Sequence, residues 1–455
     1  MAAAYDTVVI GSGPGGYVAA IRAAQLGMRT AIVERDRLGG RCLNYACIPA
    51  KAVLRVADVL SEIREADEYG ITVSAPQVDF AGITDRRQKV VKTLTGGVGG
   101  LMKKNAIDVL EGAGTLLGPG KLTVDGTEIQ AGTIILATGS VMRPIPGTSF
   151  GDHVIGTEEA WALEELPASM AVVGAGASGA EIASAYARLG TEVVLFEALD
   201  RVLPSEDADI SKLVERGLKR QGMEIHTSTQ VQEVASGEDS VSFTYGESEV
   251  EVQWLVIAAG RGPDIDGLGL DTAGVTLGER GLIAVDGRMR TNLQGVYAIG
   301  DLVPGPALAH KASDEGVIAV EDAAGMATHP IEYIDVPRAT FCTPNVASFG
   351  LTEAQARDAG HEVTIGKVQY GAVGAGTVYG DRTGLVKIVG ETKYGEVLGG
   401  HIVGSKATEM IQELVNAKSL EGGYPELAHL VHGHPTMSEA VMEAARAADG
   451  WLIHG

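Results

Sequence analysis

Two cysteines stand five residues apart in the stretch GGRCLNYACIPAK, residues 39–51. Cys42 and Cys47 could form a redox disulfide, contribute to a metal site or be two inert buried thiols. In an ideal α-helix, residues i and i+5 have Cα atoms about 8.6 Å apart, whereas a disulfide needs about 4.4–6.8 Å between its Cα atoms. The pair therefore cannot be bridged across regular helix.

The residues that follow the pair predict a helix. Pro49 favours a position in the first turn, and the following KAVLRVADVLSEI has helical apolar spacing. The cysteines should then lie at an irregular helix entry, where the helix dipole and Lys51 can stabilise a thiolate. Zinc needs four ligands, and C-x4-C without a second Cys pair or a nearby His cluster does not supply them. Spacing alone leaves a redox pair and two inert thiols both open.

A second group of reactive side chains lies near the C-terminus, in HLVHGHPTMSEAVMEAARAAD. His432 and His434 precede a predicted helix, and an imidazole can take a proton from a thiol near pH 7. Pro435 favours an extended backbone at His434, which helps to present its side chain. Thr436 and Glu439 have the spacing of a capping box, so Glu439 could equally be a helix cap. A histidine at a helix entry is also often structural.

These groups need a scaffold, and an internal repeat predicts one. Residues 5–34 and 170–197 each read as strand, glycine-rich turn, helix and strand, ending on Glu34 and on Glu197. In both copies the Glu lies 23 residues beyond the first glycine. The glycines let backbone amides and a helix N-terminus approach and bind a pyrophosphate. The acid can accept hydrogen bonds from the diol of a ribose. The glycines of the two GxGxxG motifs are Gly11, Gly13, Gly16, Gly174, Gly176 and Gly179.

The second acid also bears on the choice of coenzyme. A carboxylate at the ribose 2′ position repels the extra phosphate of NADP, so Glu197 favours NAD(H). Arg201, four residues later, is a basic side chain that could change this preference.

Composition excludes several classes of protein. The 455 residues are 45% hydrophobic and 21% charged, with 62 glycines, as expected for an α/β protein of several domains. The net charge of -23 would repel a nucleic acid backbone; it suits a basic protein partner or simply solubility. No basic segment precedes an apolar stretch at the N-terminus, and no apolar run reaches about 18 residues. With only three cysteines, we expect a cytoplasmic protein without a membrane span.

The cysteine stretch resembles the redox-active signature of the pyridine nucleotide disulfide oxidoreductases, GGTCLNxGCIPSK. The resemblance runs from residue 5 to about residue 445, and four further stretches agree: ILATGS (135–140), TNLQGVYAIGD (291–301), LAHKASDEG (308–316) and HGHPTMSE (432–439). It implies an α/β fold with two Rossmann-like dinucleotide-binding domains, a central domain and an α+β C-terminal dimerisation domain. Turn-rich stretches set the expected boundaries: FAD domain 1–146, NAD domain 147–263, central domain 264–337 and interface domain 338–455.

The resemblance also assigns the catalytic residues. Cys47 would be the thiol next to the flavin and Cys42 the thiol that exchanges with substrate. Lys51 would lie near the flavin ring and pair with Glu181. In the family the general base comes from the partner subunit of a homodimer; here it would be His434, oriented by Glu439.

The implied cofactors are FAD at the first dinucleotide site and NAD at the second. Glu34 would bind the adenosine ribose of FAD, and Asp301 the flavin's sugar-like chain. No metal is expected. The full predicted cofactor set is Gly11, Gly13, Gly16, Glu34, Lys51, Thr138, Gly139, Asp301, Ala309, Gly174, Gly176, Gly179, Glu197 and Gly260.

The activity implied is NAD-dependent oxidation of dihydrolipoamide on a lipoyl-bearing carrier protein, of a 2-oxoacid dehydrogenase complex or of glycine cleavage. One alternative is a related reductase of glutathione-like disulfides that uses NADPH, against which Glu197 argues. Reduction of mercuric ion is a weaker alternative, because the C-terminal DGWLIHG has no cysteine pair. A noncatalytic dinucleotide sensor or assembly subunit would not need the Cys pair, Lys51 and the His434 and Glu439 set.

Some positions depart from the family pattern. Residues 369–380 lack its usual Phe- and Arg-bearing sequence, which leaves substrate contacts less defined than redox contacts. Cys342 has no cysteine near it in the sequence and is expected to be an inert buried thiol. The remaining departures are Arg41, Ala46 and Ala50 around the cysteines, and Ala177 and Ser178 where larger side chains often shield the flavin.

Overall fold

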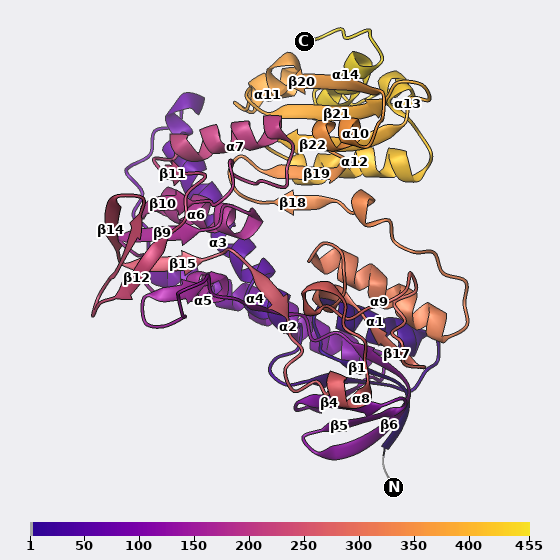
Figure 1. Cartoon of the computed structure of the whole chain (residues 1–455). Coiled ribbons are helices and arrows are strands. Elements are labelled where there is room, and N and C mark those ends of the chain that lie inside the picture. Colours follow the sequence, from indigo (N-terminus) through magenta and orange to yellow (C-terminus); the bar gives the residue numbers. More distant parts are fainter. Residues whose placement is uncertain (1–2) are drawn as a thin grey trace. The chain divides into compact units, whose positions relative to one another are not determined.

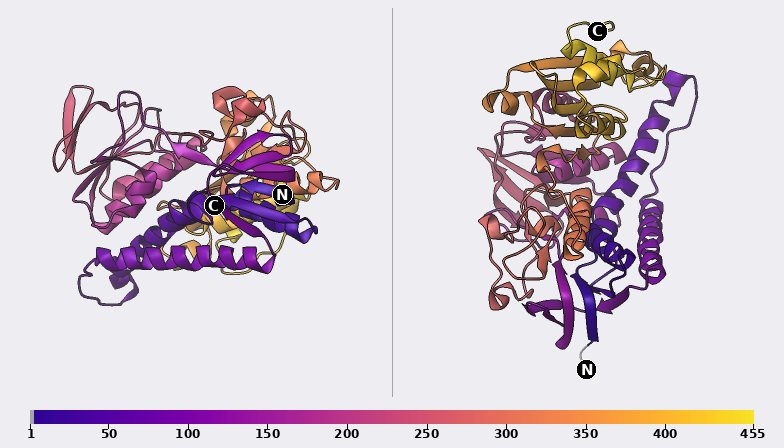
Figure 2. Two further views of the ribbon diagram at one scale, coloured as in Figure 1. Left: turned by 90° about the horizontal axis from the view of Figure 1, so that it is seen from below. Right: turned by 90° about the vertical axis from the view of Figure 1, so that its right-hand side faces the viewer.

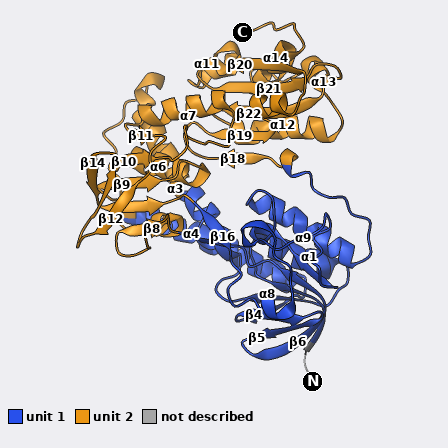
Figure 3. Cartoon of the chain, in the orientation of Figure 1, with its two compact units in different colours: residues 1–52, 81–143, 260–333 blue, residues 53–80, 144–259, 334–455 orange. Residues whose placement is uncertain are grey.

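The computed structural model describes residues 3–455 and divides into two compact units (Figure 3). Both units are assembled from three separate stretches of chain. The first takes in the chain up to Ala52 together with Ala81–Arg143 and Gly260–Tyr333. The second takes in Val53–Phe80, Pro144–Ala259 and Ile334–Gly455.

The first unit is built on a seven-stranded sheet in the order β3-β2-β1-β6-β5-β4, with β17 also paired to β6 (Figure 1). β1 runs parallel to β6 from Ala3 opposite Ile129 to Ile10 opposite Leu136. β5 pairs antiparallel with the start of β6, and β17 pairs parallel with its end. The strands are β1 (Ala3–Ile10), β2 (Thr30–Glu34), β3 (Asp108–Glu111), β4 (Gly114–Gly118), β5 (Lys121–Val124), β6 (Thr127–Leu136) and β17 (Val296–Ala298).

Two helices of this unit, α1 (Pro14–Gln25) and α9 (Ala309–Ala323), pack closely because both present small residues. A Cβ added to Gly15 would lie 2.8 Å from the Ala312 carbonyl oxygen, and one added to Gly316 would lie 2.7 Å from that of Gly15. In the left view of Figure 2, α4 is the long purple helix. The other elements are α2 (Gly40–Asn44), α4 (Phe80–Lys104), β7 (Ser140–Met142) paired with β16 (Arg261–Pro263), α8 (Leu270–Ala273), and the 3₁₀ turns η2 (Glu279–Gly281) and η3 (Gly300–Leu302).

The second unit contains a parallel five-stranded sheet in the order β11-β10-β9-β15-β8 and an antiparallel meander, β12-β13-β14. β9 and β10 are the two strands that the second half of the repeat predicts, and α6 lies between them. Helix α3 (Cys47–Arg64) starts in the first unit and continues into this one. The elements of residues 66–257 are η1 (Ala66–Tyr69), β8 (Val154–Gly156), α5 (Thr157–Ala162), β9 (Ser169–Val173), α6 (Ala177–Leu189), β10 (Glu192–Phe196), α7 (Ala208–Arg220), β11 (Glu224–His226), β12 (Gln232–Ser236), β13 (Val241–Tyr245), β14 (Ser248–Val252) and β15 (Trp254–Ile257).

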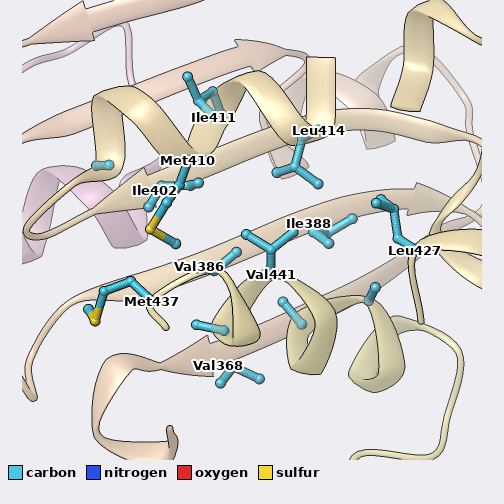
Figure 4. Close-up of a cluster of buried hydrophobic side chains, with 14 of the residues drawn as sticks. Val368, Val386, Ile388, Ile402, Met410, Ile411, Leu414, Leu427, Met437 and Val441 are labelled. Atoms are coloured by element: carbon cyan, nitrogen blue, oxygen red, sulfur yellow. The ribbon is translucent and has the colours of Figure 1, made fainter. Parts of the chain in front are cut away.

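The C-terminal part of this unit is an antiparallel sheet in the order β18-β19-β22-β21-β20. Apolar side chains of its strands gather with those of α12, α13 and α14 in one buried cluster (Figure 4). All seven residues of β22 are buried, which accounts for its nearly continuous apolar sequence. The elements are η4 (Tyr333–Asp335), β18 (Arg338–Thr340), β19 (Val346–Gly350), α10 (Glu353–Asp358), β20 (Val363–Gln369), η5 (Tyr370–Ala372), α11 (Gly374–Val378), β21 (Leu385–Glu391), β22 (Val397–Val403), α12 (Ala407–Ser419), α13 (Tyr424–His429) and α14 (Glu439–Ala448).

A buried lysine links α7 to the C-terminal sheet. Lys387 on β21 is only 2% exposed. Its Nζ lies 2.9 Å from carboxylate oxygens of Asp207, Asp209 and Glu353. Asp207 caps α7 by accepting from the Asp209 N–H at 3.0 Å. One cation therefore joins residues of three elements inside the second unit.

The fold class expected from the sequence is confirmed: strand, glycine turn, helix and strand occur twice, and an α+β region ends the chain. Some predicted details differ. The second strand of the later copy ends at Phe196, so Glu197 follows it rather than ending it. Helix α14 begins at Glu439, and only half of the predicted capping box is present: the Thr436 N–H donates to Glu439 Oε2 at 2.8 Å, whereas Thr436 Oγ1 donates to the Gly433 carbonyl at 2.7 Å. Among residues 3–455, no helix is both long and apolar enough to cross a membrane.

Candidate active site

The first glycine loop joins β1 to α1. Gly11 has φ +105°, and a Cβ there would lie 2.3 Å from the Ala137 carbonyl oxygen. A Cβ at Gly16 would lie 1.9 Å from the Gly11 carbonyl oxygen, so the helix can approach the strand only if this residue is glycine. Gly13, the N-cap of α1, is different, since a Cβ there would meet no protein atom within 4 Å.

The second loop repeats these features. Gly174 has φ +100°, and a Cβ on Gly179 would lie 1.8 Å from the Gly174 carbonyl oxygen. Gly176 is the N-cap of α6, and a Cβ there would meet nothing within 4 Å. In each loop the outer glycines are required by backbone geometry, and the middle one faces open space at a helix N-terminus. That space, beside unpaired helix N–H groups, fits the pyrophosphate of a dinucleotide.

The acid of each repeat lies against its own glycine loop. Glu34 Oε2 accepts hydrogen bonds from the Ser12 N–H at 3.0 Å and from Ser12 Oγ at 2.5 Å, and its Oε1 accepts from the Asp36 N–H at 2.9 Å. Glu197 accepts from the Ala175 N–H at 2.7 Å and from the Leu199 N–H at 2.9 Å. Backbone amides thus fix both carboxylates at the edge of the predicted dinucleotide sites, in the same way.

Asp301 lies in η3, just after β17, and accepts a hydrogen bond from Ser140 Oγ. Arg261 holds that serine, because its Nε donates to Ser140 Oγ at 2.8 Å and its Nη2 to the Ser140 carbonyl at 2.5 Å. Nearby in the chain, the Gly139 carbonyl accepts from the Asp264 N–H at 2.9 Å. The residues after β6 are therefore tied to the stretch that begins at residue 261.

Three other predicted cofactor residues have structural positions of their own. Thr138 Oγ1 donates to the Asp264 carbonyl at 2.6 Å. Ala309 is the first residue of α9. The Gly260 carbonyl accepts from the Arg143 N–H at 3.2 Å, and a Cβ on Gly260 would meet nothing within 4 Å. Their contact with a cofactor stays a prediction.

The two cysteines lie at a helix entry, as the sequence predicts. Cys42 is in the short helix α2, Cys47 is the first residue of α3, and the backbone turns between them at Tyr45, where φ is -130°. The two half-buried thiols share a hydrogen bond. That hydrogen bond and burial raise the pKa of the Cys42 thiol, while the positive charges of Lys51 and Arg41 act in the opposite direction.

Lys51 and Arg41 favour a thiolate at Cys42, in the direction that the sequence predicts. At this sulfur the hydrogen bond shared with Cys47 and the loss of solvation act more strongly, so the net direction of the pKa is upward.

His434 and Glu439 form a pair at the start of α14. His434 Nδ1 lies 2.9 Å from Glu439 Oε1, and the imidazole side chain is 74% exposed whereas the carboxylate is 15% exposed. Burial opposes ionisation of Glu439, but hydrogen bonds from the Thr436 N–H and from His434 hold the pKa of Glu439 below its ordinary value. A carboxylate thus orients a histidine whose other nitrogen faces outward, as a general base requires.

The neighbouring histidine has a different partner. His432 Nε2 lies 2.6 Å from Glu413 Oε1 on α12. This hydrogen bond raises the pKa of His432, against the effect of burial. His432 is thus held to the body of the second unit by Glu413, and His434 is the histidine that remains available.

Glu181 is buried on α6 and accepts a hydrogen bond from the Phe341 N–H at 2.9 Å. Lys51 belongs to the first unit and Glu181 to the second. Their pairing stays a prediction, as does the approach of His434 to the cysteines.

The departures from the family pattern occupy distinct environments. The Ala46 carbonyl accepts from the Ala50 N–H at 2.9 Å, which begins the hydrogen bonding of α3, and Ala50 is buried. Ala177 and Ser178 are exposed in the first turn of α6. Cys342 is fully buried, and its Sγ lies 3.2 Å from the Pro344 carbonyl.

Several contributors were missed by reasoning from the sequence. Ser12 binds Glu34 through both its amide and its hydroxyl, and its place between Gly11 and Gly13 was the signal that could have shown it. Ser140, Arg261 and Glu413 act through contacts that span from 19 to 161 residues of sequence, and no spacing rule points to them. Among residues 3–455, no three His, Cys, Asp or Glu side chains are grouped so as to hold a metal ion.

The chain matches a known protein family over most of its length. Residues 5–316 match the family described as pyridine nucleotide-disulphide oxidoreductase, and residues 336–445 match the dimerisation domain of pyridine nucleotide-disulphide oxidoreductases. A dihydrolipoyl dehydrogenase of Bacillus subtilis is 42% identical over 100% of both chains. A dihydrolipoyl dehydrogenase of Mycobacterium tuberculosis is 44% identical over 99% of both chains.

Solved structures of two other proteins have a similar fold. LpdA from Mycobacterium tuberculosis superposes with a TM-score of 0.90 at 28% identity, covering 97% of this chain and 99% of that one. The HOCl-induced flavoprotein disulfide reductase RclA from Escherichia coli superposes with a TM-score of 0.87 at 28% identity, covering 98% of this chain and 100% of that one.

Proposed function

This chain belongs to the pyridine nucleotide-disulphide oxidoreductase family, and we propose that it acts as a dihydrolipoamide dehydrogenase, oxidising protein-bound dihydrolipoamide with NAD⁺. One observation carries the proposal. A hydrogen-bonded Cys42 and Cys47 pair stands at the entry of α3, in a chain that aligns end to end with dihydrolipoyl dehydrogenases.

The two dinucleotide sites are assigned to FAD and NAD. The loop of Gly13 and Glu34 would hold the adenosine diphosphate part of FAD, and Asp301 its sugar-like chain. The loop of Gly176 and Glu197 would hold NAD(H), since a fixed carboxylate repels a 2′-phosphate. When bound, FAD accepts two electrons from the reduced cysteine pair and NAD⁺ accepts them as hydride.

The residues of the chain would carry out the thiol chemistry. One substrate thiolate attacks Cys42 in the Cys42–Cys47 disulfide, forming a mixed disulfide and releasing Cys47 as a thiolate. The second thiolate of the substrate then attacks the substrate sulfur of this mixed disulfide, which closes the lipoamide ring and releases Cys42 as a thiolate. The substrate loses two electrons and two protons, and the cysteine pair gains the two electrons.

His434 would take the proton that makes a substrate thiol reactive. Glu439 holds Nδ1 of the imidazole at 2.9 Å, which directs Nε2 outward. Family members form this site from two subunits, and the match to the dimerisation domain indicates a homodimer. We assign His434 to the partner's Cys42 and Cys47.

The substrate carrier would be a lipoyl-bearing protein of a 2-oxoacid dehydrogenase complex or of glycine cleavage, in the cytoplasm. The net charge of -23 supports docking to a basic module of such a complex. If charge drives this docking, the affinity should fall as salt rises above about 0.15 M; an affinity that salt leaves unchanged would exclude this mode.

A steady-state assay tests the proposal. Purified protein should reduce NAD⁺ in the presence of dihydrolipoamide, and NADP⁺ should be a much poorer acceptor because of Glu197. A yellow, FAD-containing protein that oxidises NADPH with a glutathione-like disulfide, and leaves dihydrolipoamide untouched, would identify a different member of the family.

A further inference from the structure

A buried ion pair in α9 has no part in the chemistry described so far. Lys311 Nζ lies 3.1 Å from Glu315 Oε1, one helical turn away, and both side chains are 0% exposed. Charged side chains are rarely buried to this extent, because the loss of solvation is not repaid by an ion pair alone. Both groups therefore need further partners.

The main partner of both is the backbone of one residue, Gly300. The Gly300 N–H donates to Glu315 Oε2 at 2.7 Å, and Lys311 Nζ donates to the Gly300 carbonyl at 2.9 Å. Gly300 has φ +73° and starts η3, the turn that carries Asp301. The two side chains thus bind the N–H and the C=O of the residue immediately before Asp301.

Tyr333 completes the cluster. Its hydroxyl donates to Glu315 Oε1 at 2.5 Å, and its ring lies 5.3 Å from Lys311 Nζ. On the other side of the turn, Ser140 Oγ donates to Asp301 itself. The Asp301 turn is therefore held by α9 through its backbone and by the end of β6 through its carboxylate.

Helix α9 also contacts the first glycine loop. Gly316, next to Glu315, packs so closely on α1 that a Cβ would lie 2.7 Å from the Gly15 carbonyl oxygen. One helix thus fixes the distance between the pyrophosphate end of the first dinucleotide site and the Asp301 turn.

We propose that Lys311 and Glu315 are positioning residues for FAD: they lock the left-handed turn at Gly300 so that Asp301 meets the sugar-like chain of the flavin at the distance set by α1. This inference rests on the proposed function through the assignment of Asp301. The ion pair itself touches no cofactor and takes no part in electron transfer.

The test compares FAD binding in holoenzyme variants. In Lys311→Met with Glu315→Gln, no unpaired charge remains buried, but the bond to the Gly300 carbonyl is lost. Release of FAD is followed by its fluorescence on dilution, and the dissociation constant by titration. We expect FAD to bind at least about tenfold more weakly, while NADH affinity of the FAD-loaded enzyme stays within about twofold.

A matched control lies on the same helix. Glu321 forms an ion pair with Arg22 between α9 and α1 but does not touch the Gly300 turn. Glu321→Gln should leave FAD release unchanged, and equal weakening in both variants would mean that α9 packing, not the Gly300 turn, is what matters, which would overturn the inference.

A milder variant covers the case in which the double variant does not fold. Tyr333→Phe removes only the hydroxyl that bonds Glu315 and should speed FAD release about two- to fivefold; an unchanged rate would refute the positioning role. If wild-type protein binds no FAD, the proposed function and this inference both fall. If wild type binds FAD and the double variant binds it equally well, only this inference falls.

Discussion

The middle glycine of the second loop offers a sharp test of the coenzyme site. Gly176 has φ -70° and ψ -175°, which any residue adopts, and a Cβ there would meet no protein atom within 4 Å. Gly176→Ala should therefore fold normally, and loss of chain freedom in the unfolded state should make it more stable by about 0.4–1 kcal/mol.

Coenzyme binding should respond in the opposite direction. The added methyl group would occupy the space beside the α6 N-terminus where the NAD pyrophosphate is proposed to lie. Displacing it would cost one charge-assisted hydrogen bond, about 1.5–3 kcal/mol, which corresponds to about 10- to 150-fold weaker binding. The measurements are the KM for NAD⁺ and the dissociation constant for NADH from fluorescence, beside the KM for dihydrolipoamide, which should not change.

The control is Gly97→Ala in α4, where a Cβ also meets nothing within 4 Å but no dinucleotide loop is near in the sequence. It should stabilise the helix without changing NADH affinity. Unaltered NADH binding by Gly176→Ala, or loss of FAD in its place, would show that we have misassigned this loop.

Three further changes give distinct results. Cys42→Ser should abolish dihydrolipoamide turnover and leave FAD bound; a protein that has lost FAD would show that the role of this thiol is misread. His434→Gln should suppress dithiol oxidation far more than NADH oxidation by artificial acceptors, and equal losses would indicate a folding defect instead of proton transfer. Lys387→Met should lower the free energy of unfolding by about 3–5 kcal/mol at pH 7, because it leaves the buried carboxylate of Asp207 without its cation. Lys387 lowers the pKa of Glu353. Burial raises the pKa of Asp207, but Lys387 and the other contacts together outweigh burial and lower it. The stability that these ions contribute is present above their ordinary pKa values and is lost as pH falls below about 4. The difference between Lys387→Met and wild type should therefore shrink on acidification, and a difference in urea unfolding that stays constant from pH 7 to well below about pH 4 would contradict the charge argument.

The parts of the site that the sequence predicted are local. Gly11 and Gly16, like Gly174 and Gly179, are glycines because the adjoining backbone leaves no room for a Cβ, so their spacing reflects the turn itself. Pro49 and the apolar spacing after it placed the start of α3 for the same reason. A short range of sequence is enough to specify such features.

The parts that the sequence did not predict depend on contacts between distant segments. Residues 260–333 fold into the first unit because β17 pairs with β6; the family resemblance assigned Asp301 to the FAD site, but no local pattern indicates this strand pairing. The direction of the pKa of Cys42 is set by how closely two turns bring the sulfurs together, which the helix dipole and Lys51 alone do not indicate. The spacing of residues in the sequence predicts which chemical groups the site contains, whereas the fold sets their contacts and the direction of their pKa shifts.

The central claim is that electrons are stored in the cysteine pair as well as on the flavin. Anaerobic titration of the purified protein with dihydrolipoamide, followed by its visible spectrum, tests this claim most directly. The account predicts uptake of about two electron pairs per subunit by the wild-type protein, and no reduction of Cys42→Ser, because the electrons of dihydrolipoamide enter through Cys42. Wild-type protein that takes up a single pair, at the flavin alone, would contradict it.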